Sequence, residues 1–134
     1  MSSLLADTSA YSAFMAGHEA IRLALQRAES IFLTPVVIAE LRVGFLGGSR
    51  RAENERVLER FLQPSRVRVA GIDAETAVRY AEIFQYLRRQ GRPVPTNDLW
   101  IAASAMQLGL RILTTDAHFQ RIPQVIVDYH PIGA

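Results

Sequence analysis

Four acidic side chains occupy positions in the sequence where a carboxylate could take part in chemistry. Asp7 follows the apolar run "LLA", and Asp116 follows "RILTT". Asp98 lies in the first turn of a helix expected after the loop "GRPVP", and Glu40 lies about one and a half turns into an apolar helix. Carboxylate oxygens are the ligands that Mg²⁺ and Mn²⁺ prefer. Such a cation supports reactions at phosphate groups, so the acids suggest metal-assisted phosphoryl chemistry.

Three of these acids also have an ordinary structural explanation. Asp7 could cap the following helix, Asp98 could complement a helix N-terminus, and Asp116 could cap a short turn. Glu40 is harder to explain in this way, because a buried carboxylate is costly unless it is paired, protonated or bound to a cation. Its helix is apolar on several sides, which predicts that the helix is either buried all round or forms a subunit interface.

The elements that must position these acids alternate along the chain. Strands are expected at 4–6, 31–33, 67–71, 111–115 and 125–129. Helices are expected from about Ser9, at 18–29, at 35–46 with Thr34 as cap, at 50–63, at about 73–90, and after a cap at Thr96 or Asn97. The helix at 73–90 carries Ala77, Tyr80, Ala81, Phe84 and Leu87 at helical spacing, which predicts its apolar face. This alternation predicts an α/β fold with a parallel sheet of about five strands flanked by helices on both faces, in a single domain over 1–134.

That fold brings the four acids together. Parallel α/β sheets bind ligands outside the carboxyl ends of their strands, and all four acids are expected at that end. Carboxylates in one pocket repel one another and raise each other's pKa values. A divalent cation removes this conflict, so the sequence predicts an acidic metal pocket with few direct protein ligands.

Composition excludes several other kinds of chemistry. The 134 residues include no cysteine, so disulfides and thiolate metal sites are excluded and a cytoplasmic location fits. All fifteen basic residues are arginine, which excludes a P-loop lysine and Schiff-base chemistry. No apolar run is long enough to span a membrane, and "MSSLLADTS" has no signal-peptide pattern.

Four motifs, "LLADTS", "PVVIAELRVG", "TNDLWIAASA" and "LTTDAHF", together resemble the PIN-domain family, and within it the VapC-type toxin ribonucleases. The resemblance implies a catalytic quartet that binds Mg²⁺ or Mn²⁺, with polar neighbours beside it. The quartet is Asp7, Glu40, Asp98 and Asp116, with Asp7 and Asp98 as the main metal ligands; the neighbours are Thr8, Asn97 and Thr115. Where some relatives carry a further acidic or amide residue, this chain has His118 and Phe119, so a fifth acid is not expected.

The resemblance also implies an activity and partners. The activity is hydrolysis of RNA phosphodiester bonds by a metal-activated water, with Asp116 completing the site or orienting that water. Glu40 would hold a water or act as the base. The implied partners are RNA, a cognate VapB-type antitoxin and a second copy of the chain in a homodimer, with no membrane. The helices at 35–46 and 50–63 are candidates for the dimer or antitoxin contact, or pack in the core.

Two alternatives remain open from the sequence. One is a PIN fold that acts only as a binding module; the other is a phosphate-accepting α/β domain, which commonly needs the lysine that this chain lacks. The three histidines, His18, His118 and His130, are candidate metal ligands or bases, but they are not spaced as one helical pair, so surface or packing roles are favoured for them. Packing is also favoured over base stacking for Tyr11 and Trp100.

Overall fold

Five short parallel strands form the sheet on which the other elements pack. A computed structural model describes residues 2–133. The strands are β1 (Ser3–Ala6), β2 (Ser30–Leu33), β3 (Val67–Val69), β4 (Arg111–Thr114) and β5 (Val127–Tyr129). Their order is β3-β2-β1-β4-β5, and every pair is parallel. The chain thus continues from β1 to one side with β2 and to the other with β4, and the crevice at such a reversal is where open α/β sheets bind ligands.

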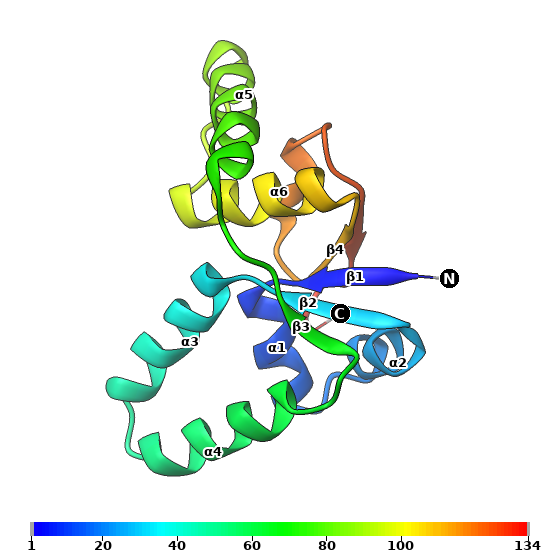
Figure 1. The fold of residues 1–134 in the computed structure, drawn as a ribbon, viewed down its shortest axis with the longest axis vertical. Helices are drawn as coiled ribbons and strands as arrows, with labels where there is room; N and C mark the ends of the chain where they lie inside the picture. The colour runs from blue at the N-terminus through cyan, green and yellow to red at the C-terminus, as the bar shows by residue number, and fades with distance from the viewer. Residues whose placement is uncertain (1, 134) are drawn as a thin grey trace.

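Helices cover both faces of this sheet, as the sequence predicts. They are α1 (Thr8–Met15), α2 (Glu19–Arg27), α3 (Pro35–Leu46), α4 (Arg51–Leu62), α5 (Ala74–Gln90) and α6 (Thr96–Leu108), and a 3-10 turn, η1 (Ala117–Arg121), follows β4. Figure 1 shows α6 on one side of the strands and α1 and α2 on the other, with the α3–α4 pair and α5 extending away from the sheet.

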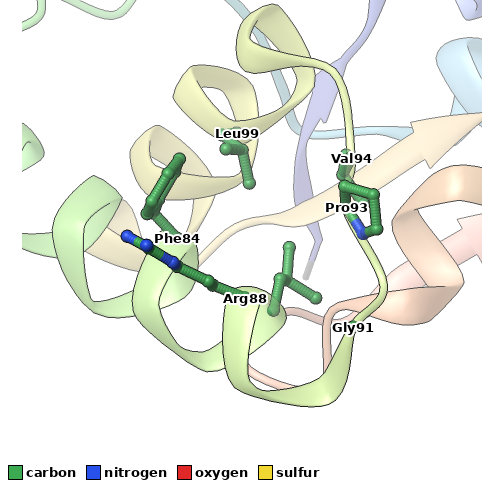
Figure 2. A pocket seen from close by; sticks show the side chains of 7 residues that line it. Phe84, Arg88, Gly91, Pro93, Val94 and Leu99 are labelled. Carbon is green, nitrogen blue, oxygen red and sulfur yellow. The ribbon is translucent and has the colours of Figure 1, made fainter.

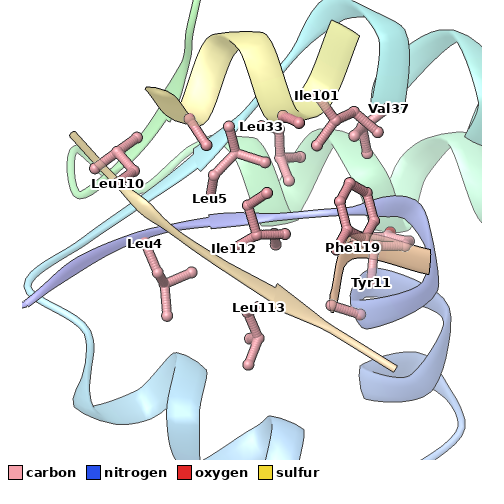
Figure 3. Packing of buried hydrophobic residues seen from close by; sticks show 14 of the residues in the cluster. Leu4, Leu5, Tyr11, Leu33, Val37, Ile101, Leu110, Ile112, Leu113 and Phe119 are labelled. Atoms are coloured by element: carbon pink, nitrogen blue, oxygen red, sulfur yellow. The ribbon is translucent and has the colours of Figure 1, made fainter. Parts of the chain in front are cut away.

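The core lies around the two central strands. Leu4 and Leu5 of β1 and Ile112 and Leu113 of β4 are 0% exposed, so successive residues on both faces of the sheet are buried. Figure 3 shows these side chains between the helices, with Phe119 of η1 packed beside them. Burial of each large apolar side chain stabilises the fold by about 2 kcal/mol. The ends of β1 and β4, where Asp7 and Asp116 follow, are therefore rigidly placed.

The helix starts follow the sequence with one exception. Thr34 caps α3 by accepting a hydrogen bond from the Val37 amide at 3.2 Å, and Pro35 is the first helical residue. The predicted cap of α6 by Thr96 or Asn97 is wrong, because Pro95 precedes the helix and no side chain caps it. The Asn97 side chain is instead engaged with another helix.

The exposed faces of two helices differ from the sequence prediction. The α3 helix is not buried all round: it buries Val37 and Leu41, while the exposed fractions of Val43 and Leu46 are 68% and 57%. That α3 forms a subunit interface, the other possibility given by the sequence, therefore stays a prediction.

The predicted apolar face of α5 is confirmed at Leu87 and in part at Tyr80, which packs against the core, and is wrong at Ala77, Ala81 and Phe84. This helix buries Thr76, Ile83 and Leu87, whereas Ala77, Ala81 and Phe84 are exposed and Tyr80 is half-buried. The cause is Thr76, whose hydroxyl pairs with the Gln107 side chain of α6, so a polar residue is satisfied in the interior. Within residues 2–133, no helix combines the length and apolar character needed to cross a membrane.

Candidate active site

Asp7 is buried and fully engaged at the end of β1. Its Oδ1 accepts hydrogen bonds from the Ala10 amide and the Ser9 hydroxyl, both at 2.8 Å, and its Oδ2 accepts one from the Thr114 hydroxyl at 2.6 Å. Burial raises the pKa of Asp7, the hydrogen bonds from Thr114, Ala10 and Ser9 oppose this rise, and the nearby Asp116 adds to it. Asp7 is therefore both the cap of α1 and a carboxylate held in one orientation.

The hydroxyl that holds Asp7 belongs to Thr114, which the sequence does not single out. Within residues 2–133, the polar contact of Thr115 near Asp7 comes from its backbone amide, which donates a hydrogen bond to the Ser9 hydroxyl at 3.0 Å. The signal that selects Thr114 is strand register: the Asp7 amide donates to the Leu113 carbonyl, so the next residue of β4 lies beside Asp7. Register between strands over a hundred residues apart cannot be read from residue types alone.

Asp98 joins this group from the first turn of α6. Burial, the charge of Asp116 and the charge of Asp7, in that order of size, raise the pKa of Asp98 from 3.8 to about 6. The effects on Asp98 mean that Asp116 and Asp7 lie near it, although the three acids come from separate elements. Three carboxylates in one place favour a proton or a cation between them.

Asp116 begins η1 and brings a histidine into the group. Its Oδ1 accepts a hydrogen bond from the His118 amide at 2.9 Å, and its own amide donates to the Thr114 hydroxyl at 2.9 Å. The His118 Nδ1 lies 3.2 Å from Asp116 Oδ1 and 3.4 Å from Asp98 Oδ2. One potential ligand atom from each of these three side chains lies within 4.8 Å of the others.

The structure brings His118 beside Asp98 and Asp116, which fits the metal-ligand or base role that the sequence left open and not the surface or packing role that it favoured. The available signal is the spacing "DAH": an aspartate that caps a turn brings the residue two positions later alongside its carboxylate. The other two histidines do have structural contacts. His18 caps α2 by accepting from the Ile21 amide, and His130 Nε2 lies 2.8 Å from Asp128.

Glu40 lies beside this group and is held by two other elements. The Thr8 hydroxyl of α1 donates to its Oε1, and the Asn97 amide of α6 donates to its Oε2 at 3.0 Å. These donors are 32 and 57 residues away in the chain, which explains how a carboxylate is accommodated in an apolar helix. Glu40 is half-buried and is not one of the three ligand atoms grouped above. It shares the region through Thr8 and Asn97, the immediate chain neighbours of Asp7 and Asp98.

An apolar groove adjoins the start of α6. It encloses about 370 Å³ between the C-terminal part of α5, the loop that follows and α6, and it is lined by Phe84, Leu87, Arg88, Gly91, Pro93, Val94 and Leu99. Figure 2 shows Phe84, Val94 and Leu99 facing this groove. Its lining suits an apolar group and not a cation. The sequence prediction that the aromatics pack holds for Trp100, which stacks on Tyr80 at 4.2 Å, and for Tyr11, which packs edge-on against Phe61 at 5.2 Å.

The donor set suits a hard divalent cation. Carboxylate oxygens of Asp98 and Asp116 face one another beside a buried imidazole nitrogen without a hydrogen-bond partner, and Asp7 is near enough to add its charge. Like charges at this spacing are stable together only when protonated or neutralised. The arrangement can hold a divalent cation and, through it, a phosphate group.

Comparisons with known proteins place this geometry in a family. Residues 4–125 match the model of the PIN domain. The chain is 34% identical to ribonuclease VapC4 of Mycobacterium tuberculosis over 125 residues, which cover 92% of this chain and 93% of that protein.

Solved structures agree with this match. DNA-bound VapBC of Salmonella typhimurium is similar with a TM-score of 0.84 and 27% identity, over 96% of this chain and 98% of that chain. VapBC-5 of Mycobacterium tuberculosis, a member of the VapBC family of toxin–antitoxin systems, is similar with a TM-score of 0.78 and 28% identity, over 97% and 100% of the two chains. The chain belongs to the PIN-domain family and, within it, is a relative of the VapC ribonucleases.

Proposed function

We propose that this protein is the toxin of a type II toxin–antitoxin system and an endoribonuclease that depends on a divalent cation. The main support is that Asp7, Asp98 and Asp116 lie together where β1 and β4 end and α6 begins. The charges of Asp116 and Asp7 there help to raise the pKa of Asp98. The similarity to a VapC ribonuclease over most of the chain supports RNA cleavage as the reaction at this acidic group. Because the proposed substrate is RNA, the proposed location of the activity is the cytoplasm.

The proposed cation is Mg²⁺ or Mn²⁺, held by Asp7 and Asp98 directly or through water, with Asp116 completing the site. When bound, such a cation lowers the pKa of a coordinated water and offsets negative charge on the phosphate oxygens. The prearranged bonds from Ser9 and Thr114 fix the Asp7 carboxylate, so little reorganisation is needed on binding.

The remaining residues of the proposed quartet and its neighbours act on water and protons. Glu40 holds a water or takes its proton, and the donors Thr8 and Asn97 keep its carboxylate in place for this role. The backbone amide of Thr115 helps to fix Ser9, one of the donors to Asp7. Water would attack the phosphorus directly, without a covalent enzyme intermediate: it would lose a proton, the phosphorus–oxygen bond to one nucleotide would break, and that oxygen would leave as a hydroxyl after taking up a proton.

The proposed partners are a VapB-type antitoxin and a second copy of the chain. An antitoxin can inhibit by placing a basic side chain among the acids, since arginine forms charge-assisted hydrogen bonds with carboxylates. The apolar exposed side of α3, with Val43 and Leu46, is the proposed antitoxin contact. Phe84 of α5, which is 42% exposed, marks the proposed homodimer contact.

The deciding experiment compares Asp98→Asn with Asp128→Asn in an RNA cleavage assay with Mg²⁺ or Mn²⁺. Both variants neutralise one aspartate with little change of shape, but Asp128 of β5 pairs with Arg111 and His130 and is outside the proposed site. We expect Asp98→Asn to lose at least about a hundredfold of the activity and Asp128→Asn to retain it.

Equal activity of the two variants would contradict the assignment. A parent protein that is folded but cleaves no RNA with either cation would support the binding module. Labelling by a small phosphodonor would support a phosphate-accepting domain.

A further inference from the structure

The imidazole of His118 has an unusual environment. Its Nδ1 is buried and has no hydrogen-bond partner, although it lies 3.2 Å from Asp116 Oδ1 and 3.4 Å from Asp98 Oδ2. A buried polar atom without a partner costs free energy, so each such atom calls for an explanation. Here the nitrogen lies within ion-pair distance of carboxylate oxygens from two other side chains, without the geometry of a hydrogen bond to either.

The spacing of these atoms is that of ligands around one ion. Two ligands bound at right angles to a cation, each at about 2.1 Å, lie about 3.0 Å apart. The distances from Nδ1 to the two carboxylate oxygens, 3.2 and 3.4 Å, are close to this separation. Each carboxylate oxygen therefore lies from Nδ1 at about the distance of a neighbouring ligand, and one potential ligand atom from each of the three side chains lies within 4.8 Å of the others.

The backbone keeps the imidazole in this position. The His118 amide donates to Asp116, and the next residue, Phe119, is 0% exposed in the core, so η1 is anchored on both sides of the ring. The His118 side chain is itself 40% exposed, which leaves room for water or phosphate as further ligands. The histidine is thus held in place yet open to solvent.

We infer that His118 Nδ1 is a ligand of the divalent cation, together with Asp98 and Asp116, and that it makes the site prefer Mn²⁺ to Mg²⁺. This inference rests on the proposed function, because it concerns the cation of the same site. Imidazole nitrogen is a better ligand for first-row transition ions than for Mg²⁺, which demands oxygen ligands. Replacing His118 should therefore weaken Mn²⁺ binding selectively.

Calorimetric titration with Mn²⁺ and with Mg²⁺ tests this selectivity in the parent, His118→Asn and His18→Asn. The control removes another imidazole, and asparagine can still cap α2. We expect His118→Asn to bind Mn²⁺ about tenfold or more weakly, with a change of less than about threefold for Mg²⁺, and His18→Asn to match the parent. An equal loss for both ions, or no loss, would overturn the inference.

Pulsed electron paramagnetic resonance of the Mn²⁺-loaded parent protein gives a second test that needs no variant. A directly bound imidazole couples its ¹⁴N nucleus to the Mn²⁺ spin, and the coupling changes when the protein is made with ¹⁵N-histidine. Bound Mn²⁺ without nitrogen coupling overturns the inference and leaves the proposed function intact. Failure of the parent to bind Mn²⁺ or Mg²⁺ at all contradicts the proposed function itself.

Discussion

Asp98 is the residue whose charge responds most to its surroundings. Burial and the charges of Asp116 and Asp7 raise its pKa to about 6, above the 3.8 expected of a free aspartate. The folded, cation-free protein thus binds more protons than the unfolded chain between about pH 4 and 6. The stability that comes from protonated Asp98 is present below pH 4 and is lost as the pH rises through 6.

This sign gives a measurable prediction. Without a cation, the Tm of the parent protein should fall between pH 5 and pH 7 compared with the Tm of Asp98→Asn. The asparagine cannot titrate, so the variant lacks this contribution. Thermal unfolding in a chelator measures the difference in Tm between the two proteins at each pH. A saturating divalent cation should remove the parent's loss at pH 7. Parallel curves for the two proteins in chelator would contradict the raised pKa.

Thr114 is the residue on which the Asp7 position depends. It is 0% exposed, donates to Asp7 and accepts from the Asp116 amide, so Thr114→Val removes one hydrogen bond from each of these two partners. We expect a loss of about 1–3 kcal/mol in the free energy of unfolding, measured by urea titration, together with weaker RNA cleavage. The control is Thr115→Val, which changes the neighbouring, half-exposed hydroxyl. Equal effects of the two substitutions would refute the assignment of the hydroxyl to Thr114.

The same two threonines show how far residue types can predict a site. The acids could be selected because carboxylates that follow strands in a parallel fold share one end of the sheet. Thr114 could not, because its place depends on the register of β4 against β1. The spacing "DAH" is a signal for His118, but the position of its ring depends on the turn that Asp116 caps. Both are properties of folded backbone and not of composition.

At the scale of the element, α3 positions Glu40 and begins at a single cap. The Thr34 hydroxyl accepts from the Val37 amide at 3.2 Å, and Thr34 is fully buried. Thr34→Ala should lower the free energy of unfolding by about 1 kcal/mol, whereas Thr34→Ser keeps the hydroxyl and should lose less. Chemical denaturation of both variants measures this difference. A serine variant as unstable as the alanine variant would mean that packing of the threonine methyl, and not the cap, matters at this helix start.

Elements were easier to predict than their faces. Short apolar runs alternating with helical patterns predicted every strand and α-helix of residues 2–133, since alternation follows from local sequence. The short turn η1 was expected only as a turn that Asp116 could cap, and the structure confirms this cap through the His118 amide. The face of α5 was misjudged because its exposed side is as apolar as its buried side, and Thr76 is made compatible with the interior by Gln107 of another helix. Contacts of this kind are tertiary and leave no local pattern.

At the scale of the whole molecule, apolar side chains stay exposed on two helices that extend from the sheet (Figure 1). One proposed surface is marked by Val43 and Leu46 of α3, and the other by Phe84 of α5. Apolar surface that stays exposed on a small domain typically marks contacts with other proteins. Since the two surfaces lie on different helices, an antitoxin and a second copy can each have one.

Two substitutions separate these contacts. Leu46→Glu should keep ribonuclease activity and the dimer but escape inhibition by the antitoxin, because a buried unpaired carboxylate opposes docking. Phe84→Glu should lower the mass measured by light scattering from dimer to monomer and leave antitoxin binding intact. Ile126→Glu changes an apolar residue that is 72% exposed outside both helices and should do neither. Each contact depends on an apolar surface, which a buried carboxylate disrupts. If Leu46→Glu broke the dimer while Phe84→Glu preserved it, α3 would therefore be the dimer contact and the proposed roles of the two surfaces would be wrong.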